Sequence, residues 1–151
     1  MTTKPFSAIY SSGLGRLRVS GQGDHISGIA LVSGGSSKGT LPARVRRSLD
    51  LYFRGKPAKG ARFILQGTPF QKKVWSTLST IPWGDTLSYA DLAKRVKRPK
   101  AVRAVANAVG SNPIAILLPC HRVIGSDGSL TGYAYGLKKK SWLLSHEKRR
   151  G

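Results

Sequence analysis

The stretch SYADLAKRVKRPKAVRAVANAVG, residues 88–110, contains two short helical patterns joined by a basic turn. The first begins at Ser88-Tyr89-Ala90-Asp91, which has the form of a capping box and is followed by apolar residues at helical spacing. The turn Lys97-Arg98-Pro99 ends this pattern, and a second helix is predicted from Lys100 to Val109, ended by Gly110. Two short helices joined by a tight turn are typical of a helix-turn-helix unit.

The second predicted helix is poor in large side chains. If Val102, Val105 and Val109 face the core, the outward face consists of small and polar residues. These are Ala101, Ala104, Ala108, Arg103 and Asn107. A helix that reads the major groove presents long polar side chains, whereas a smooth face favours a narrow groove, where an arginine could replace an extruded base. An ordinary alanine-rich packing helix would show the same pattern.

The segments on either side complete a helical C-terminal lobe, residues 68–151. Upstream, Thr68-Pro69-Phe70-Gln71 predicts a helix start, because it combines a capping Thr, a Pro at the first helical position and a Gln three residues after the cap. Downstream, Ile114 to Leu118 is predicted to form a short buried strand or extended segment that leads to Cys120. A glycine-rich stretch follows, and then a last helix from about Leu137 to Glu147.

Residues 1–67 predict a smaller α+β lobe with no catalytic pattern of its own. Strands are expected at Ala8–Tyr10, Leu17–Val19, Ile26–Val32 and Arg62–Leu65. Apolar residues recur every fourth position from Leu41 to Phe53, which predicts a helix with Thr40 as its cap and Gly55 at its end. The predicted fold class is therefore α+β, with a scaffold lobe and a helical lobe.

The charge of the chain is strongly one-sided: among 151 residues, 26 are Lys or Arg and 6 are Asp or Glu, a formal net charge of +20 at pH 7. Such a chain favours polyanionic partners, of which nucleic acid is the first candidate. A membrane partner is disfavoured, because no apolar run approaches the roughly 20 residues of a span and the N-terminus lacks the apolar core of a signal peptide. The clusters Lys138–Lys140 and Lys148–Arg150 are interpreted as a solvated basic face.

Cys120 is the only cysteine, which excludes an intrachain disulfide and a cysteine-based zinc cluster. The three histidines, His25, His121 and His146, are dispersed, so neither a metal nor a cofactor is expected. A lone cysteine is more often a small buried hydrophobic residue than a nucleophile. Its neighbours favour the second role, because an adjacent histidine or arginine raises the thiolate fraction.

A base for Cys120 must lie within hydrogen-bond reach of the thiol, and it needs a partner that orients it. His121 follows directly, but adjacent side chains of an extended segment point to opposite faces, so a turn or a bridging water would be required. Glu147, the only glutamate in the chain, is a candidate partner, although its place beside His121 does not follow from the sequence. By default Asn112-Pro113 is a turn and Tyr89 a half-buried packing residue.

The run NPIAILLPCHRVIG, residues 112–125, surrounds Cys120 with a distinctive pattern. Further motifs at fixed spacing are IPWG (81–84) with SYADLA (88–93), PKAVRAV (99–105), TGYA (131–134) and WLLSHE (142–147). Together they resemble the O6-alkylguanine-DNA alkyltransferases, also called methylated-DNA–protein-cysteine methyltransferases. The resemblance covers residues 68–148, and before them only LYFRG (51–55) shows it weakly.

This resemblance implies catalytic roles for five residues. Cys120 would be the alkyl acceptor, His121 the base that takes the thiol proton through a water, and Glu147 the carboxylate that orients the histidine. Asn112 would tie the active-site segment to the recognition helix, and the Tyr89 hydroxyl would protonate or hydrogen-bond guanine N3.

The resemblance also implies a base pocket and a DNA-binding surface. The pocket-lining residues would be Val123, Ala115, Tyr133 and Ala134. The carbonyls of Cys120 and Val123 would hold the guanine amino group, and Arg103 would replace the flipped nucleotide. The DNA-binding helix would also present Lys100, Ala101 and Ala104. Tyr135 departs from many relatives, and its bulk is hypothesised to narrow access for large alkyl groups such as benzyl.

The family fold implied is an RNase H-like α/β lobe followed by a winged helix-turn-helix lobe, here residues 1–67 and 68–151. The reaction implied is an irreversible transfer of the alkyl group to Cys120 from O6-alkylguanine, and from O4-alkylthymine, so that each molecule acts once. Its partner would be double-stranded DNA, bound in the minor groove with the damaged nucleotide flipped out. The protein would act as a monomer in the cytoplasm, associated with the nucleoid in a prokaryote.

Three other functions compete with this one. An alkyltransferase-like binding protein recognises the lesion without removing it, but such proteins lack the acceptor that Cys120 supplies here. A helix-turn-helix regulator with a structural cysteine would prefer one operator sequence. A thiol hydrolase would turn over repeatedly, and the absence of a second base and acid argues against it.

Overall fold

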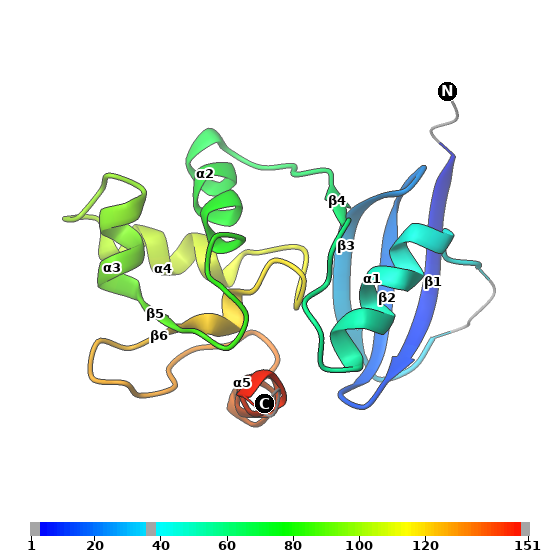
Figure 1. The fold of residues 1–151 in the computed structure, drawn as a ribbon. Coiled ribbons are helices and arrows are strands. Elements are labelled where there is room, and N and C mark those ends of the chain that lie inside the picture. Colours follow the sequence, from blue (N-terminus) through cyan, green and yellow to red (C-terminus); the bar gives the residue numbers. More distant parts are fainter. Residues whose placement is uncertain (1–3, 36–38, 149–151) are drawn as a thin grey trace. The chain divides into compact units, whose positions relative to one another are not determined.

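The computed structural model describes residues 4–35 and 39–148. The chain combines helices with two small sheets (Figure 1) and divides into two compact units. Unit 1 consists of Met1–Gln66 with Pro113–Leu117, and unit 2 of Gly67–Asn112 with Leu118–Gly151. None of the helices in the described ranges has the length and hydropathy of a membrane span.

Unit 1 is built on a four-stranded sheet in the order β1-β2-β3-β4. Its strands are β1 (Pro5–Ser12), β2 (Gly15–Gln22), β3 (His25–Val32) and β4 (Arg62–Phe63). The first three are antiparallel neighbours, and β4 pairs with β3 in parallel. In β2 the buried Leu17 and Val19 alternate with the exposed Arg16 and Arg18, so one face of the sheet belongs to the core.

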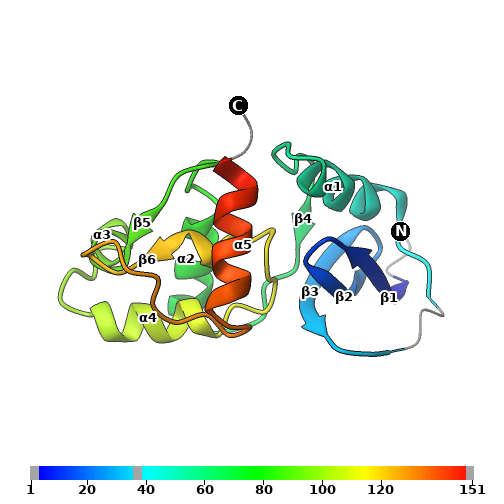
Figure 2. The ribbon, with the colours of Figure 1, turned by 90° about the horizontal axis from the view of Figure 1, so that it is seen from below.

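Helix α1 (Ala43–Phe53) lies along one face of this sheet, as Figures 1 and 2 both show. It buries Val45, Leu49 and Tyr52, as the apolar spacing predicted in part. The predicted cap Thr40 is wrong, because the helix begins after Pro42. Pro42 makes no side-chain cap, and the Pro42 carbonyl accepts a hydrogen bond from the amide of Arg46. Because the ring of proline fixes φ near −65°, Pro42 can start the helix without a hydroxyl cap.

The segment Pro113–Leu117 joins unit 1 although it follows α4 in the chain. The amide of Ile29 donates to the carbonyl of Pro113, and the amide of Ala115 donates to the carbonyl of Ile29, both at 3.0 Å. The strand predicted over Ile114–Leu118 is wrong beyond this single bridge, since the chain then turns, with φ +74° at Ile116. A β-branched residue rarely adopts such a φ, and nothing in the apolar pattern signals it.

Unit 2 contains four α-helices within its described residues, α2 (Pro69–Leu78), α3 (Tyr89–Arg95), α4 (Val102–Gly110) and α5 (Leu137–Lys148). Both predicted caps are confirmed: Thr68 and Gln71 form a complete capping box, and the Ser88 hydroxyl accepts from the amide of Asp91. The sequence did not predict the short strands β5 (Leu87–Ser88) and β6 (Val123–Ile124), which pair in parallel.

The orientation of α4 differs from the prediction at two positions. Val105 and Val109 are buried as predicted, but Val102 is 36% exposed and Ala108 only 4%. Helix α2 approaches α4 at Ala108, whose carbonyl accepts a 2.7 Å hydrogen bond from Trp75 Nε1. A small side chain permits this close approach, so the core face of α4 is turned toward Ala108 and away from Val102.

Candidate active site

Cys120 lies at the start of the 3₁₀ helix η1 (Cys120–Arg122), which directly precedes β6. Its amide donates to the carbonyl of Leu118 at 2.7 Å, and its side chain is partly exposed. The extended geometry considered for this segment is therefore wrong at Cys120 and His121. In a 3₁₀ helix consecutive side chains are separated by about 120°, so the two do not point to opposite faces.

His121 is fully buried and contacts Glu147, which comes from α5. His121 Nε2 lies 2.6 Å from Glu147 Oε2. The structure therefore brings together the residue after the sole cysteine and the sole glutamate of the chain. The arrangement suits a base whose ring is held by a carboxylate.

Arg122 completes this buried cluster, and its contacts there are not predicted from the sequence. Its Nε donates to Glu147 Oε1 at 2.8 Å and its Nη2 to Oε2 at 3.1 Å, a forked contact with both carboxylate oxygens. Its Nη1 donates to the carbonyl of Ile81 at 2.6 Å. The available signal was an arginine directly before the apolar pair Val123-Ile124, because a buried charge must be paired.

The charges of this cluster favour an ionised glutamate and a neutral histidine. Burial raises the pKa of Glu147, but the hydrogen bonds and charges of His121 and Arg122 outweigh it and lower the pKa to about 2. Burial lowers the pKa of His121, and the charges of Arg122 and Lys140 add to that effect against the pull of Glu147. A neutral ring that donates from Nε2 to the carboxylate keeps a lone pair on Nδ1.

Nδ1 is the ring nitrogen of His121 on the side away from Glu147. It is buried and has no hydrogen-bond partner among the residues that the structure describes. Buried polar atoms are normally paired, so this nitrogen, in the residue that directly follows Cys120, is a candidate functional group. This nitrogen is available to take a proton.

Asn112 supports Cys120 from the end of α4. Its Nδ2 donates to the carbonyl of Leu118 at 2.8 Å, and its side chain also hydrogen-bonds Cys120. Burial raises the pKa of the Cys120 thiol, while the hydrogen bond from Asn112 and the positive charge of Lys140 act in the opposite direction. The thiol is therefore mostly protonated in the resting protein, and its reactivity depends on a base.

Lys140 corrects an interpretation of the sequence. The solvated basic face predicted for Lys138–Lys140 is wrong at Lys140, whose side chain is fully buried. Its ammonium donates to the carbonyls of Val123, Thr131 and Gly132 at 2.7, 2.9 and 3.1 Å. Three carbonyls satisfy the three donors of the ammonium, which is why a buried lysine is tolerated here.

Two tyrosines face the same region. The Tyr89 hydroxyl donates to the carbonyl of Thr131 at 3.3 Å, and Lys140 Nζ lies 5.9 Å from the centre of its ring. The Tyr133 hydroxyl is buried without a partner within the described residues, and its ring meets that of Tyr135 edge-on. Burial and the nearby Cys120 charge raise the pKa of both Tyr89 and Tyr133, so both remain protonated donors.

The remaining predicted site residues are spread over both units. Val123 is buried in β6, Ala134 is exposed, and Ala115 is buried in unit 1 by its contact with Ile29. On and before α4, the residues Lys100, Arg103, Ala104 and Asn107 are exposed and Ala101 is partly exposed. These exposed positions form one cationic face without an acidic residue.

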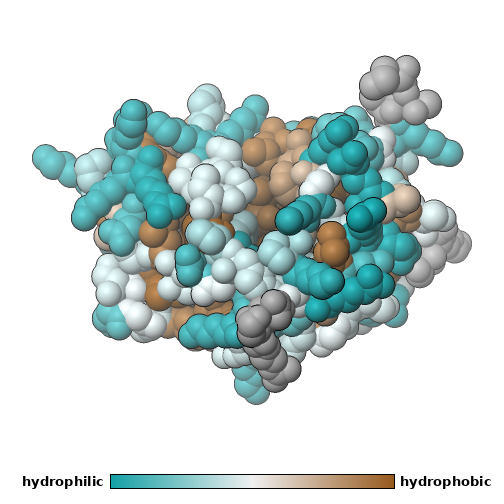
Figure 3. All heavy atoms as spheres, in the orientation of Figure 1, coloured by the Kyte–Doolittle hydropathy of each residue, from teal (hydrophilic) through white to brown (hydrophobic). Residues whose placement is uncertain are grey.

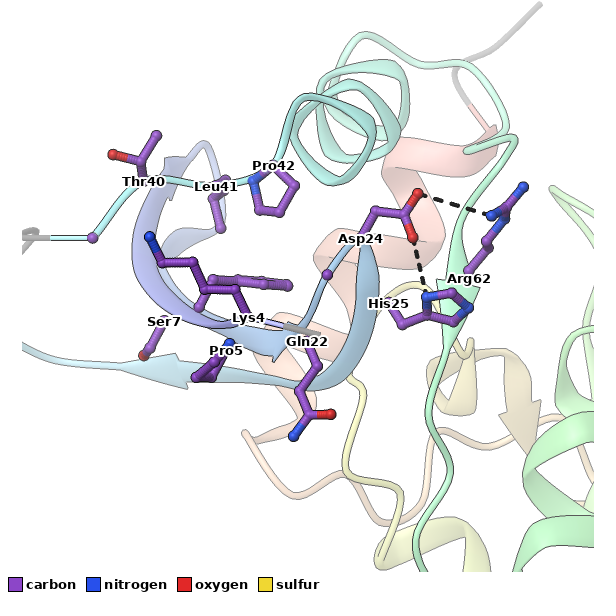
Figure 4. A pocket seen from close by; sticks show the side chains of 13 residues that line it. Lys4, Pro5, Ser7, Gln22, Asp24, His25, Thr40, Leu41, Pro42 and Arg62 are labelled. Carbon is purple, nitrogen blue, oxygen red and sulfur yellow. Dashed lines mark ion pairs between the residues drawn. The ribbon is translucent and has the colours of Figure 1, made fainter. Parts of the chain in front are cut away.

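Unit 1 has a separate groove of about 960 Å³ beside the turn between β2 and β3. Figure 4 shows Asp24 at its rim, paired with His25 Nδ1 at 3.0 Å and with Arg62 at 3.9 Å. No nucleophile comparable to Cys120 lines it, so it is not the centre of covalent chemistry. Within the described part of the chain, no group of three or more His, Cys, Asp or Glu is placed to hold a metal ion.

Comparison with known proteins relates the chain to one family. The family model for "6-O-methylguanine DNA methyltransferase, DNA binding domain" matches residues 69–149. A probable methylated-DNA–protein-cysteine methyltransferase of Acanthamoeba polyphaga mimivirus is 59% identical over 103 residues, which are 67% of this chain and 68% of the relative. A methylated-DNA–protein-cysteine methyltransferase of Shigella flexneri is 59% identical over 81 residues, 54% of this chain and 47% of the relative.

Two solved structures match over nearly the whole chain. The O6-methylguanine methyltransferase of Mycobacterium tuberculosis superposes with a TM-score of 0.88 at 36% identity, covering 97% of this chain and 94% of that protein. The same bacterium's protein in complex with DNA superposes with a TM-score of 0.84 at 39% identity, covering 94% and 92%. The alignments with the two curated relatives, by contrast, span about half to two thirds of those relatives' length.

Proposed function

The chain belongs to the 6-O-methylguanine DNA methyltransferase family, and from this membership we propose that it repairs DNA by moving the alkyl group of O6-alkylguanine onto Cys120. The observation that carries the proposal is the buried His121, held at Nε2 by Glu147 and unpaired at Nδ1 within the described residues. Such a base, next to the only cysteine, suits a nucleophile that must lose its proton before it reacts.

The reaction balances without a cofactor. The Cys120 thiol gives its proton to His121 Nδ1 through a water, and the thiolate attacks the alkyl carbon. The new carbon–sulfur bond forms as the bond from carbon to O6 breaks, and the electron pair returns to the guanine ring. The Tyr89 hydroxyl donates a hydrogen bond or proton to guanine N3 as the base leaves, and the proton that His121 accepted from the thiol balances the one that the released guanine gains. The thioether has no leaving group that restores the thiolate, so each molecule acts once.

The guanine would lie between the side chain of Tyr133 and β6. The carbonyls of Cys120 and Val123 would accept from the guanine amino group. Lys140 already uses one lone pair of the Val123 carbonyl, and a carbonyl oxygen has a second lone pair for the substrate. The buried Tyr133 hydroxyl, unpaired in the described chain, is a further donor or acceptor for the base.

The DNA-binding element would be the pair α3 and α4, acting as a helix-turn-helix unit with α4 in the minor groove. Its exposed face carries Arg103, which would fill the stack when the damaged nucleotide flips into the pocket. The small Ala101 and Ala104 would allow close approach, and Lys100 would contact phosphate. An alkylated guanine pairs poorly with the opposite base, which lowers the free-energy cost of flipping its nucleotide out of the duplex.

The finer architecture belongs to the same proposal. The sheet of unit 1, with one parallel edge strand and α1 on one face, supports an RNase H-like scaffold lobe, residues 1–67. The order α3, α4, β6 supports a winged helix-turn-helix lobe, residues 68–151, that holds the acceptor. The protein would act as a monomer wherever the cell keeps its DNA, the cytoplasm or nucleoid of a prokaryote.

One experiment tests this function directly. The protein is incubated with a duplex oligonucleotide that contains one O6-methylguanine, and the intact protein mass is measured. The expected result is a gain of one methyl group on Cys120, with no more than one lesion repaired per molecule. The Cys120→Ala variant is the control and should bind the duplex without a mass change. Repeated turnover, or a preference for one undamaged operator sequence, would refute the proposal.

A further inference from the structure

Unit 1 carries a run of exposed cations from α1 to β4. These are Arg44, Arg46, Arg47, Arg54, Lys56, Lys59 and Arg62. The only acidic residue within this range is Asp50, whose carboxylate accepts a 2.6 Å hydrogen bond from the Tyr10 hydroxyl. Figure 3 shows hydrophilic side chains gathered over α1. Neither catalysis at Cys120 nor the packing of unit 1 requires this concentration of positive charge.

Part of the run lines a groove between α1 and the chain that follows it. The groove has a volume of about 580 Å³ and is lined by Ala43, Arg44, Arg47, Leu51, Lys59 and Gly60. Arg44, Arg47 and Leu51 follow at spacings of three and four, so they share one face of the helix. No acidic residue belongs to the lining.

The cations of this groove have different tasks. Arg44 Nη1 donates to the carbonyl of Gly60 at 2.9 Å and its Nε pairs with Asp24 at 3.2 Å, so Arg44 fixes the loop to the helix. The Ser48 hydroxyl donates to the carbonyl of Lys59 at 3.1 Å and holds the same loop from inside. These contacts hold the loop against α1, so the exposed Arg47 lines the groove from the helix and the exposed Lys59 lines it from the loop.

We propose that this groove, with Arg47 and Lys59 at its walls, is a second contact surface for the phosphate backbone of duplex DNA, separate from α4. The inference rests on the proposed function, which brings the chain to DNA. An α-helix of 11 residues is about 16 Å long, the axial rise of about five base pairs, so α1 offers cations over several successive phosphates. Contacts to phosphate carry no sequence information and therefore suit a lesion that occurs anywhere.

The test compares two double variants that each lower the net charge by the same amount. Arg47→Gln with Lys59→Gln removes the groove cations. Arg16→Gln with Arg18→Gln is the matched control, because these exposed residues alternate with buried Leu17 and so lie on the opposite face of the sheet. Affinity for an undamaged duplex is measured as a function of salt concentration, and far-ultraviolet circular dichroism checks the fold.

Loss of two phosphate contacts should reduce the slope of log affinity against log salt by about 1.8. Between about 50 and 200 mM salt, the affinity of the unmodified protein should fall about tenfold more than that of the groove variant. The control variant should keep the original slope, and so should Arg47→Lys with Lys59→Arg, which retains both charges. An unchanged slope in the groove variant, or an equal change in the control, would overturn the inference.

The readout separates this inference from the repair reaction. Methyl transfer from a short single-stranded oligonucleotide is measured in parallel, and the groove variant should transfer at the original rate. If the slope changes but no protein acquires a methyl group, the groove binds DNA and the repair assignment fails. If transfer occurs but the slope is unaffected, the repair assignment stands and the groove is refuted.

Discussion

His121 and Glu147 are 26 positions apart in the chain, yet His121 Nε2 lies 2.6 Å from Glu147 Oε2 and neither side chain reaches solvent. The forked contact of Arg122 with the same carboxylate leaves both oxygens fully engaged. The carboxylate therefore fixes both the His121 ring and the buried Arg122 guanidinium. Loss of Glu147 should affect both the stability and the chemistry of the protein.

Glu147→Gln should lower the free energy of unfolding at neutral pH by about 3 kcal/mol, because it leaves the buried Arg122 without its counter-charge. The pKa of Glu147 is about 2 in the folded protein, below the ordinary 4.5. Its stabilising effect is thus complete above about pH 4.5 and is lost as the pH falls toward 2. Urea denaturation over this pH range measures the difference between the two proteins.

The exposed Asp85 is the matched control for that measurement, since Asp85→Asn removes a carboxylate that touches no buried charge. The free energy of unfolding of Asp85→Asn should change with pH in the same way as that of the unmodified protein. A Glu147→Gln protein with an unchanged acid dependence would show that the buried cluster does not stabilise the fold.

Asn112→Ala should slow the modification of Cys120. The thiol pKa lies above its ordinary 9.0 because of burial, and the hydrogen bond from Asn112 limits that rise. Without it the pKa should rise further, so that reaction with iodoacetamide needs a higher pH. The rate is measured against pH in the DNA-free protein, where Tyr89, Tyr133 and Lys140 also face the thiol. A curve identical to the original would refute the role of Asn112.

Lys140→Met should raise the pKa of the Cys120 thiol, because it removes the positive charge that favours the thiolate. It should also lower the free energy of unfolding by about 1–3 kcal/mol, since three carbonyls lose their donor. Lys138→Met, which changes an exposed neighbour on the same helix, should alter neither property. Equal effects of the two variants would contradict the role of the buried ammonium.

Arg103→Ala should slow methyl transfer from duplex DNA by about tenfold, because nothing then fills the stack behind the flipped nucleotide. Transfer from a single-stranded oligonucleotide should keep its rate, since that base needs no extrusion. Single-turnover kinetics on both substrates measure the ratio. Equal losses on both would show that Arg103 acts on the pocket or on folding rather than on flipping.

Tyr135→Gly should increase transfer from O6-benzylguanine relative to O6-methylguanine. The ring of Tyr135 lies 5.7 Å from that of Tyr133, centre to centre, and its removal would widen the space beside the pocket tyrosine. Intact protein mass after exposure to each free base gives the two rates. A ratio that does not change would mean that Tyr135 leaves the pocket entrance open.

Local chemistry explains what the sequence could predict. The caps at Thr68 and Ser88 involve residues three positions apart, so four letters suffice to identify each helix start. Burial of Val105 and Val109 follows from their spacing on one helix. For the candidate site, spacing alone could not pair Glu147 with His121; the family resemblance implied the pair, and the structure places the two side chains in contact.

The features that escaped prediction depend on distant segments. Lys140 is buried because the carbonyls of Val123 in β6 and of Thr131 and Gly132 converge on it, and no pattern within α5 reveals that convergence. Ala108 faces the core because Trp75 of another helix approaches there. The turn at Ile116 comes two residues after the bridge that joins Ile114 to β3, and its positive φ is unfavourable for isoleucine.

The return of Pro113–Leu117 to unit 1 has a practical consequence for anyone who wishes to shorten this protein. A fragment that begins at Gly67 would still carry Ile114 and Ile116, which are 0% and 1% exposed, but it would lack the β3 strand to which Ile114 is bridged. That fragment would expose these two isoleucines four and six positions before Cys120 and should aggregate at low concentration. Each unit is compact in space, but no single cut in the sequence separates the two units, because each is built from two segments of the chain.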